Sequence, residues 1–120
     1  MIKKNNRLLF SKKLRLLKSH SFNYVFKKPI KTEYCEITIL SRYNHFNFPR
    51  LGIIVSKKVS KYSYKRNKIK RIIRESFRLV QHHLLSLDFI LIVKKNILII
   101  KTKNLKKKIK YLWIRHYQYI

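Results

Sequence analysis

The sequence predicts one domain of the α/β class. Two apolar segments, residues 51–57 and 88–94, have the length and the composition of buried strands. Between them lies a longer segment, residues 60–85, whose apolar residues follow helical spacing. A strand, a helix and a strand in this order predict a parallel pair joined by a crossover. The chain has 120 residues, 46% of them hydrophobic, which suits a single domain with its own core.

The N-terminal part predicts a basic arm followed by a short helix. Residues 1–13 are basic and lack periodicity, so we expect a flexible arm. Phe22, Val25 and Phe26 follow at positions i, i+3 and i+4, which places them on one helical face. Pro29 is expected to end this helix, because proline disfavours helical backbone in the residue before it.

Two more elements complete the expected domain, which spans residues 14–117 and leaves residues 118–120 as a C-terminal end. Residues 33–42 are rich in β-branched side chains and predict one strand. Residues 102–117 predict a final helix. Its shared apolar face carries Leu105, Ile109, Leu112, Trp113 and His116. The sequence contains no internal repeat that would indicate a second domain.

The expected central helix separates an apolar face from a basic one. The apolar face carries Ile69, Ile72, Ile73, Ser76, Phe77, Val80 and Leu84. The opposite face carries Asn67, Lys70, Arg71, Arg74 and Arg78. Like charges repeat at i, i+4 from Arg66 to Arg78, and each such pair costs about 0.2–0.5 kcal/mol. A phosphate backbone would reverse this penalty, so the pattern indicates a nucleic-acid partner.

The charge balance of the whole chain points the same way. The sequence contains 31 Lys and Arg against 4 Asp and Glu, a formal net charge of +27. Such an excess destabilises the compact state and favours binding to a polyanion.

The longest apolar runs are far shorter than the roughly 20 residues of a membrane-spanning helix. A lone cysteine, Cys35, is compatible with a reducing compartment.

The acidic residues and histidines argue against catalysis by the protein alone. Cleavage by protein-held metal ions needs clustered carboxylates, whereas the four here are scattered: Glu33, Glu36, Glu75 and Asp88. His82 and His83 are adjacent and would point in different directions on a helix. A histidine-dependent ribonuclease remains an alternative, as does a DNA-binding module. We expect no catalytic residue and no metal site made of protein side chains.

Several motifs resemble those of the bacterial ribonuclease P protein subunit. Residues 65–78, KRNKIKRIIRESFR, closely resemble the signature helix of that family. Further similar motifs follow the family order: Leu14-Arg-Leu-Leu17 with Phe22, Val25 and Phe26, Pro49-Arg-Leu-Gly52, Val55-Ser-Lys-Lys58, Asp88-Phe89, Val93-Lys-Lys95 and Leu112-Trp113. Lys68 departs from the family pattern, which usually has arginine there, so bidentate phosphate contact is lost.

The resemblance implies a two-layer α/β sandwich with the order α-β-β-β-α-β-α. It also implies a left-handed crossover around the signature helix, against the general preference for right-handed crossovers. The first strand would be a short piece split from residues 33–42.

The resemblance also implies that the chain joins a catalytic RNA and assists removal of the 5′ leader from precursor tRNA. The residues that would contact the catalytic RNA are Arg66, Asn67, Lys68, Lys70, Arg71 and Arg74. Phe22 and Phe26 would line a cleft for the single-stranded leader, although they could equally be ordinary core residues. Lys57 and Lys58, just past a strand end, are candidate phosphate contacts.

The same likeness implies the remaining partners and the cofactor. Mg²⁺ would be held by RNA phosphates, with one protein per RNA, in the bacterial cytoplasm. The alternative is a ribosomal or other structural RNA-binding protein with no role in tRNA processing. That alternative explains the charge but not the ordered series of motifs.

Overall fold

The computed structural model describes residues 10–34 and 36–117. Its elements are α1 (Ser19–Lys27), β1 (Ile30–Tyr34), β2 (Ile37–Tyr43), β3 (Arg50–Ile54), α2 (Ser63–Val80), β4 (Leu87–Val93) and α3 (Thr102–Ile114). Short 3₁₀ turns lie at Lys12–Leu14, Gln81–His83 and Lys95–Ile99. The expected order α-β-β-β-α-β-α is therefore confirmed.

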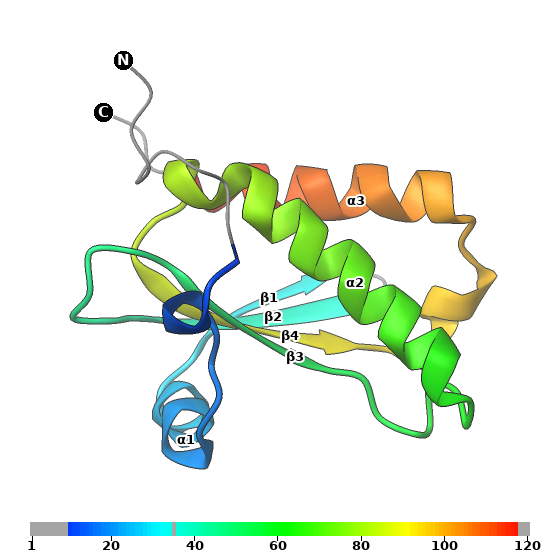
Figure 1. The fold of residues 1–120 in the computed structure, drawn as a ribbon, viewed down its shortest axis with the longest axis horizontal. Helices are drawn as coiled ribbons and strands as arrows, with labels where there is room; N and C mark the ends of the chain where they lie inside the picture. Colours follow the sequence, from blue (N-terminus) through cyan, green and yellow to red (C-terminus); the bar gives the residue numbers. More distant parts are fainter. Residues whose placement is uncertain (1–9, 35, 118–120) are drawn as a thin grey trace.

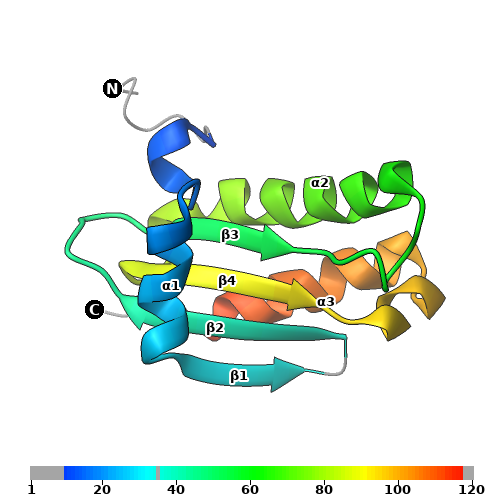
Figure 2. The same cartoon turned by 90° about the horizontal axis from the view of Figure 1, so that it is seen from below.

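The four strands form one mixed sheet with the order β1-β2-β4-β3. β2 pairs antiparallel with β1 and with β4, whereas β3 and β4 form the parallel pair expected from the sequence. Figure 2 views the sheet from the side of α1: β3 and β4 run in the same direction, and α2 passes behind them. The connection from β3 through α2 to β4 is therefore left-handed, as the resemblance implies and against the general preference.

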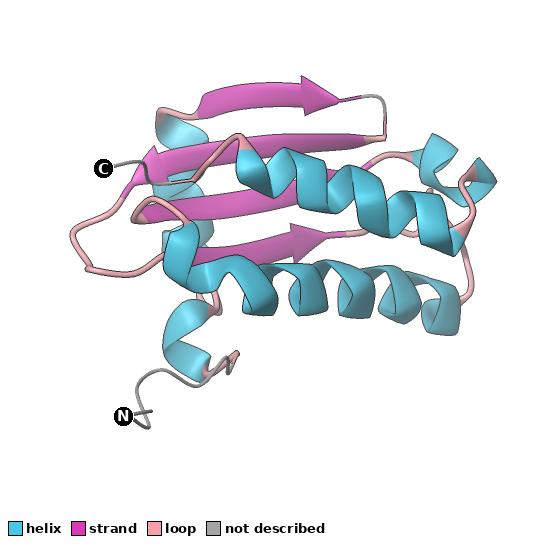
Figure 3. Cartoon of the chain, turned by 90° about the horizontal axis from the view of Figure 1, so that it is seen from above, coloured by secondary structure: helices cyan, strands magenta, loops and turns pink. Residues whose placement is uncertain are grey.

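The helices cover the two faces of the sheet unequally. α2 and α3 lie side by side on one face, and α1 lies on the other (Figures 1 and 3). β4, which lies inside the sheet, is buried along nearly its whole length, whereas the edge strand β1 is largely exposed. This difference explains the continuous apolar run of β4. The similar run at residues 51–57 also predicts a buried strand, but β3 lies at the other edge of the sheet.

The main core lies between the sheet and the pair α2 and α3. α2 contributes Ile69, Ile73, Phe77 and Val80, and α3 contributes Leu105, Ile109, Leu112 and Trp113. The ring of Trp113 is fully buried and meets Phe77 and Phe89 edge to face. Its indole nitrogen donates a hydrogen bond of 2.9 Å to the hydroxyl oxygen of Ser76. This bond explains how a serine fits on the apolar face of α2.

The prediction of a single strand at residues 33–42 was wrong. The chain reverses between Tyr34 and Ile37, which face each other in the β1–β2 register. β1 begins at Ile30, before the predicted segment. The reversal contains no Gly, Pro or Asn, and β-branched residues occur on both sides of it. Composition alone therefore could not locate the turn.

Other predicted bounds were too long. β3 ends at Ile54, so Lys57 lies beyond the strand, and α3 ends at Ile114. α2 ends at Val80, and Leu84 is buried after the following 3₁₀ turn rather than on the helix. The flexible arm predicted for residues 1–13 falls mostly outside the described residues. Of its described part, Phe10 packs edge to face against Phe77.

Candidate nucleic-acid interface

The outward face of α2 carries the basic side chains that the sequence places there. Asn67, Lys68, Arg71 and Arg74 are exposed, and Arg66 and Lys70 are half-buried. The opposite side of α2 packs into the main core, so these six residues share one continuous face.

This basic face contains a single carboxylate, Glu75, which is paired with Arg78. The four Asp and Glu side chains form these ion pairs: Glu33 with Lys31, Glu36 with Lys108, Glu75 with Arg78 and Asp88 with Arg50. Within the described part of the chain, no carboxylate pairs with Arg71 or Arg74. The like-charge repulsion around Arg71 and Arg74 is therefore not relieved by an ion pair among the described residues.

The turn before α2 extends the basic face. Lys57 and Lys58 are exposed there, while the neighbouring Val59 is buried and holds the turn against the core. The guanidinium of Arg66 donates a 2.7 Å hydrogen bond to the backbone oxygen of Ser60. Arg66 therefore fixes this turn to the first turn of α2, in addition to the RNA contact predicted for it.

A small pocket connects the basic face to the side of the sheet that carries α1. Lys70 and Arg74 line it together with Phe10, Arg15 and Phe22, and its volume is about 190 Å³. Two groups of predicted site residues, the cations of α2 and an aromatic residue of α1, therefore meet beside β3.

Phe22 and Phe26 differ in their surroundings. Both lie on α1, with ring centroids 6.4 Å apart. Phe22 is half-buried and packs against the second hydrophobic cluster, which comprises Leu16, Val25, Leu40 and Ile90. A Cβ atom on Gly52 would lie 2.7 Å from the Phe22 ring, so this close packing requires glycine. Phe26 is 43% exposed, so its ring is available to a ligand.

The face of the sheet beside α1 is only partly covered. α1 crosses the strands near one end, and the remaining surface has no helix over it (Figure 2). Ile54 and Ile92 lie half-buried on this side of the sheet, packed against the second hydrophobic cluster. An aromatic helix beside an open apolar sheet face can hold an unpaired strand of RNA.

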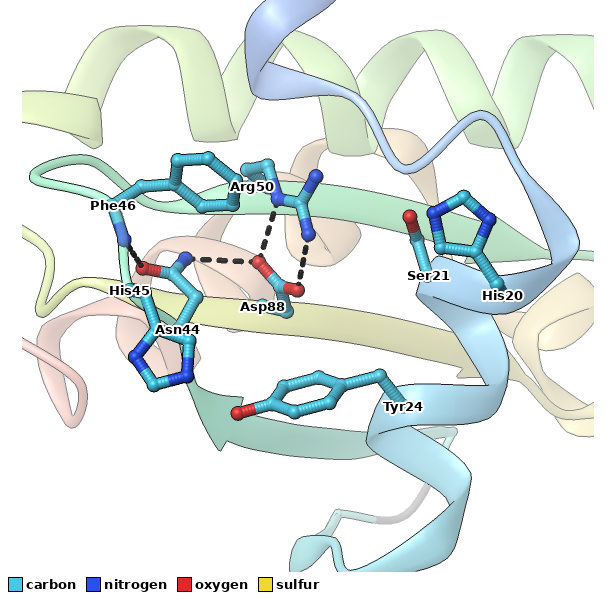
Figure 4. Close-up of a pocket in the computed structure, with 8 residues that line it drawn as sticks. All are labelled: His20, Ser21, Tyr24, Asn44, His45, Phe46, Arg50 and Asp88. Atoms are coloured by element: carbon cyan, nitrogen blue, oxygen red, sulfur yellow. Dashed lines mark hydrogen bonds and ion pairs between the residues drawn. The ribbon is translucent and has the colours of Figure 1, made fainter.

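A second pocket lies between α1 and the loop before β3 (Figure 4). Its floor is Asp88, which is fully buried and accepts hydrogen bonds from Arg50 at 2.8 and 2.6 Å and from the side-chain amide of Asn44 at 2.9 Å. His20 and His45 stand at its sides. This network was missed in the sequence, where the only signal is an acidic residue inside an apolar strand.

The described residues contain no cluster of three His, Cys, Asp or Glu side chains that could hold a metal ion. His82 is exposed, and His83 stacks on Tyr117. His116 is half-buried, and burial lowers the pKa of its imidazole.

None of the described helices is long and apolar enough to cross a membrane.

The model of the family described as Ribonuclease P matches residues 10–117. The chain belongs to the ribonuclease P protein family. It is 53% identical over 109 residues to the ribonuclease P protein component of Buchnera aphidicola subsp. Baizongia pistaciae, covering 91% of this chain and 96% of that protein. It is 44% identical over 110 residues to that of Edwardsiella ictaluri, covering 92% of each.

Solved structures of ribonuclease P proteins share the fold. A mutant ribonuclease P protein of Staphylococcus aureus superimposes with a TM-score of 0.79 at 31% identity, covering 83% of this chain and 85% of that one. The protein of Thermotoga maritima gives a TM-score of 0.74 at 28% identity, covering 84% and 96%. The family resemblance is confirmed, and these findings favour a ribonuclease P protein over a ribosomal or other structural RNA-binding protein.

Proposed function

We propose that this chain binds the catalytic RNA of ribonuclease P through α2 and assists removal of the 5′ leader from precursor tRNA. The observation that carries the proposal is the basic face of α2, on which Arg71 and Arg74 have no carboxylate partner among the described residues. This face reaches the aromatic side of α1 through the pocket beside β3. A polyanion would relieve the repulsion along α2, and the neighbouring aromatic surface suits an unpaired strand.

The catalytic RNA is assigned to the outward face of α2 and the turn before it. The residues that would contact it are Arg66, Asn67, Lys68, Lys70, Arg71 and Arg74, with Lys57 and Lys58 as further phosphate contacts. Arg71 and Arg74 are the strongest candidates because they are exposed cations without a carboxylate partner in the described residues. Guanidinium groups can also bind phosphate through two parallel hydrogen bonds.

The 5′ leader is assigned to the partly open sheet face beside α1. Phe26 is exposed and can stack on an unpaired base. Phe22 combines two roles in this proposal: its packing over Gly52 positions α1, and its accessible edge contributes to the cleft.

Bond cleavage is assigned to the RNA. Each carboxylate of the chain is engaged by Lys or Arg, so the described residues offer poor ligands for Mg²⁺. We propose that RNA phosphates hold Mg²⁺ and that the protein favours the folded complex by neutralising charge. One protein per RNA and a location in the bacterial cytoplasm belong to the same proposal.

Reconstitution tests the proposal. The catalytic RNA alone and the RNA with this protein would be compared for leader cleavage over a series of Mg²⁺ concentrations. We expect the protein to increase cleavage most strongly at low Mg²⁺, while the protein alone cleaves nothing. Equal cleavage with and without protein at every Mg²⁺ concentration would contradict the proposal.

A further inference from the structure

Two exposed tyrosines lie together at the start of α2. Tyr62 and Tyr64 are 46% and 67% exposed. Their ring centroids are 5.7 Å apart, with an angle of 39° between the ring planes. Neither ring belongs to the two hydrophobic clusters of the described residues. The pair therefore presents an aromatic surface that packing of the core does not use.

Cations surround this tyrosine pair. The ammonium groups of Lys61 and Lys65 lie 5.2 and 5.3 Å from the centre of the Tyr62 ring. Lys57 and Lys58 are exposed on the same turn. Lysines around exposed aromatic rings suit a nucleotide, whose base can stack on a ring while its phosphate is attracted by the ammonium groups.

The backbone that carries the pair is held in place. The backbone oxygen of Tyr62 accepts hydrogen bonds from the amides of Lys65 and Arg66. The amide of Tyr62 donates to the hydroxyl of Ser60 at 3.2 Å, and Arg66 binds the backbone oxygen of that same serine. A stacking surface ordered in this way loses little conformational entropy when a ligand binds.

We propose that Tyr62 and Tyr64 form a stacking site for an unpaired base of the ribonuclease P RNA. This inference rests on the proposed function, because that RNA must already lie along α2. Lys61 and Lys65 lie over the ring of Tyr62, whereas the ring of Tyr64 is the more exposed. The base therefore stacks on Tyr64. The site is separate from the leader cleft, since α1 and the start of α2 lie at opposite ends of the sheet (Figures 1 and 2).

The test compares the affinity of four proteins for the ribonuclease P RNA over a range of KCl concentrations: the unchanged chain, Tyr62→Leu with Tyr64→Leu, Tyr62→Phe with Tyr64→Phe, and Tyr111→Leu. The leucine pair removes both aromatic rings and should weaken binding about 5- to 150-fold, the loss of one stacked base. The phenylalanine pair keeps the rings and should bind within about twofold of the unchanged chain. Tyr111, 56% exposed on α3, is the matched control and should show no loss.

Two further readouts separate stacking from other roles. The salt dependence should be the same for the leucine pair and the unchanged chain, because no phosphate contact is removed. RNA carrying 5-iodouridine should crosslink to Tyr64 upon irradiation. The single variant Tyr64→Leu should reproduce most of the loss, and unchanged thermal unfolding would exclude misfolding.

Several outcomes would overturn the stacking site. If the leucine pair bound the RNA as tightly as the unchanged chain, no base would stack on the tyrosines, and their exposed surface would instead suit a protein partner. A changed salt slope would mean that the tyrosines only position Lys61 and Lys65. In contrast, failure of the unchanged chain to bind the RNA would contradict the proposed function itself.

Discussion

At the scale of single residues, the best-supported interaction in the fold is the buried pair of Arg50 and Asp88. The two residues lie far apart in the sequence and come from neighbouring parallel strands. Asn44 completes the network and holds the loop before β3 against β4. No spacing rule connects these positions, so the sequence could show only that a lone acidic residue inside an apolar strand needs a partner.

Asp88→Ala should strongly destabilise the protein. It leaves a largely buried guanidinium without its carboxylate, which typically costs about 3–5 kcal/mol. Urea denaturation would measure the change in the free energy of unfolding. The matched control is Glu33→Ala, which breaks an ion pair whose two side chains are each 58% exposed and should therefore change the free energy of unfolding far less. Equal losses in the two variants would show that Asp88 does not hold the loop.

His116 should make the stability of the free protein depend on pH. Burial lowers the pKa of His116 in the folded state, so the unfolded chain binds this proton more readily. The free energy of unfolding should therefore fall as the pH decreases below about 6.5, the ordinary pKa of histidine, and continue to fall until the folded protein is protonated as well. His116→Gln should flatten this dependence between about pH 5 and pH 7, whereas His82→Gln, at an exposed position, should not.

Phe26 allows a cleaner test of the leader cleft than Phe22, because it can be removed without opening the core. Phe26→Ala should weaken binding of leader-bearing precursor tRNA about 5- to 150-fold, the loss of one stacked base, and leave binding of mature tRNA unchanged. Both affinities would be measured for the complex with the catalytic RNA. Phe22→Ala should lower the thermal stability as well. Equal weakening for the two RNAs would remove Phe26 from the leader cleft.

At the scale of elements, α2 combines two requirements on opposite faces. Its apolar face completes the main core, and its outward face concentrates positive charge that, among the described residues, only the pairing of Glu75 with Arg78 offsets. Periodicity was sufficient to predict this division, because burial of α2 follows the apolar spacing. The turn between β1 and β2 could not be predicted from composition, and the left-handed crossover came only from the family resemblance.

Replacing Arg71 and Arg74 together by Ala should weaken RNA binding and flatten its salt dependence. RNA binding releases fewer counterions when phosphate contacts are lost. For two lost contacts, the slope of log K against log [KCl] should decrease in magnitude by about 1.4 to 1.8. The control is Lys103→Ala with Lys107→Ala, which removes the same charge from exposed positions of α3. If both double variants changed the slope equally, only net charge would matter and α2 would not be the docking face.

At the scale of the whole molecule, the charge of +27 and the compact fold oppose each other. Salt and RNA should both relieve this conflict, although by different means. Raising KCl screens the repulsion and should increase the melting temperature of the free protein. Bound RNA should also increase the melting temperature. At a free RNA concentration of 100 times the Kd, it should add about 2.7 kcal/mol to the free energy of unfolding.

The two effects should oppose each other when they are combined. Because salt weakens RNA binding, the extra stabilisation by RNA should shrink as KCl increases, while the melting temperature of the free protein increases. Thermal unfolding at several KCl concentrations, with and without the ribonuclease P RNA, measures both trends. An RNA increment that stayed constant across the salt series would mean that binding does not depend on phosphate contacts. In that case, the excess of cations would need another explanation than docking to RNA.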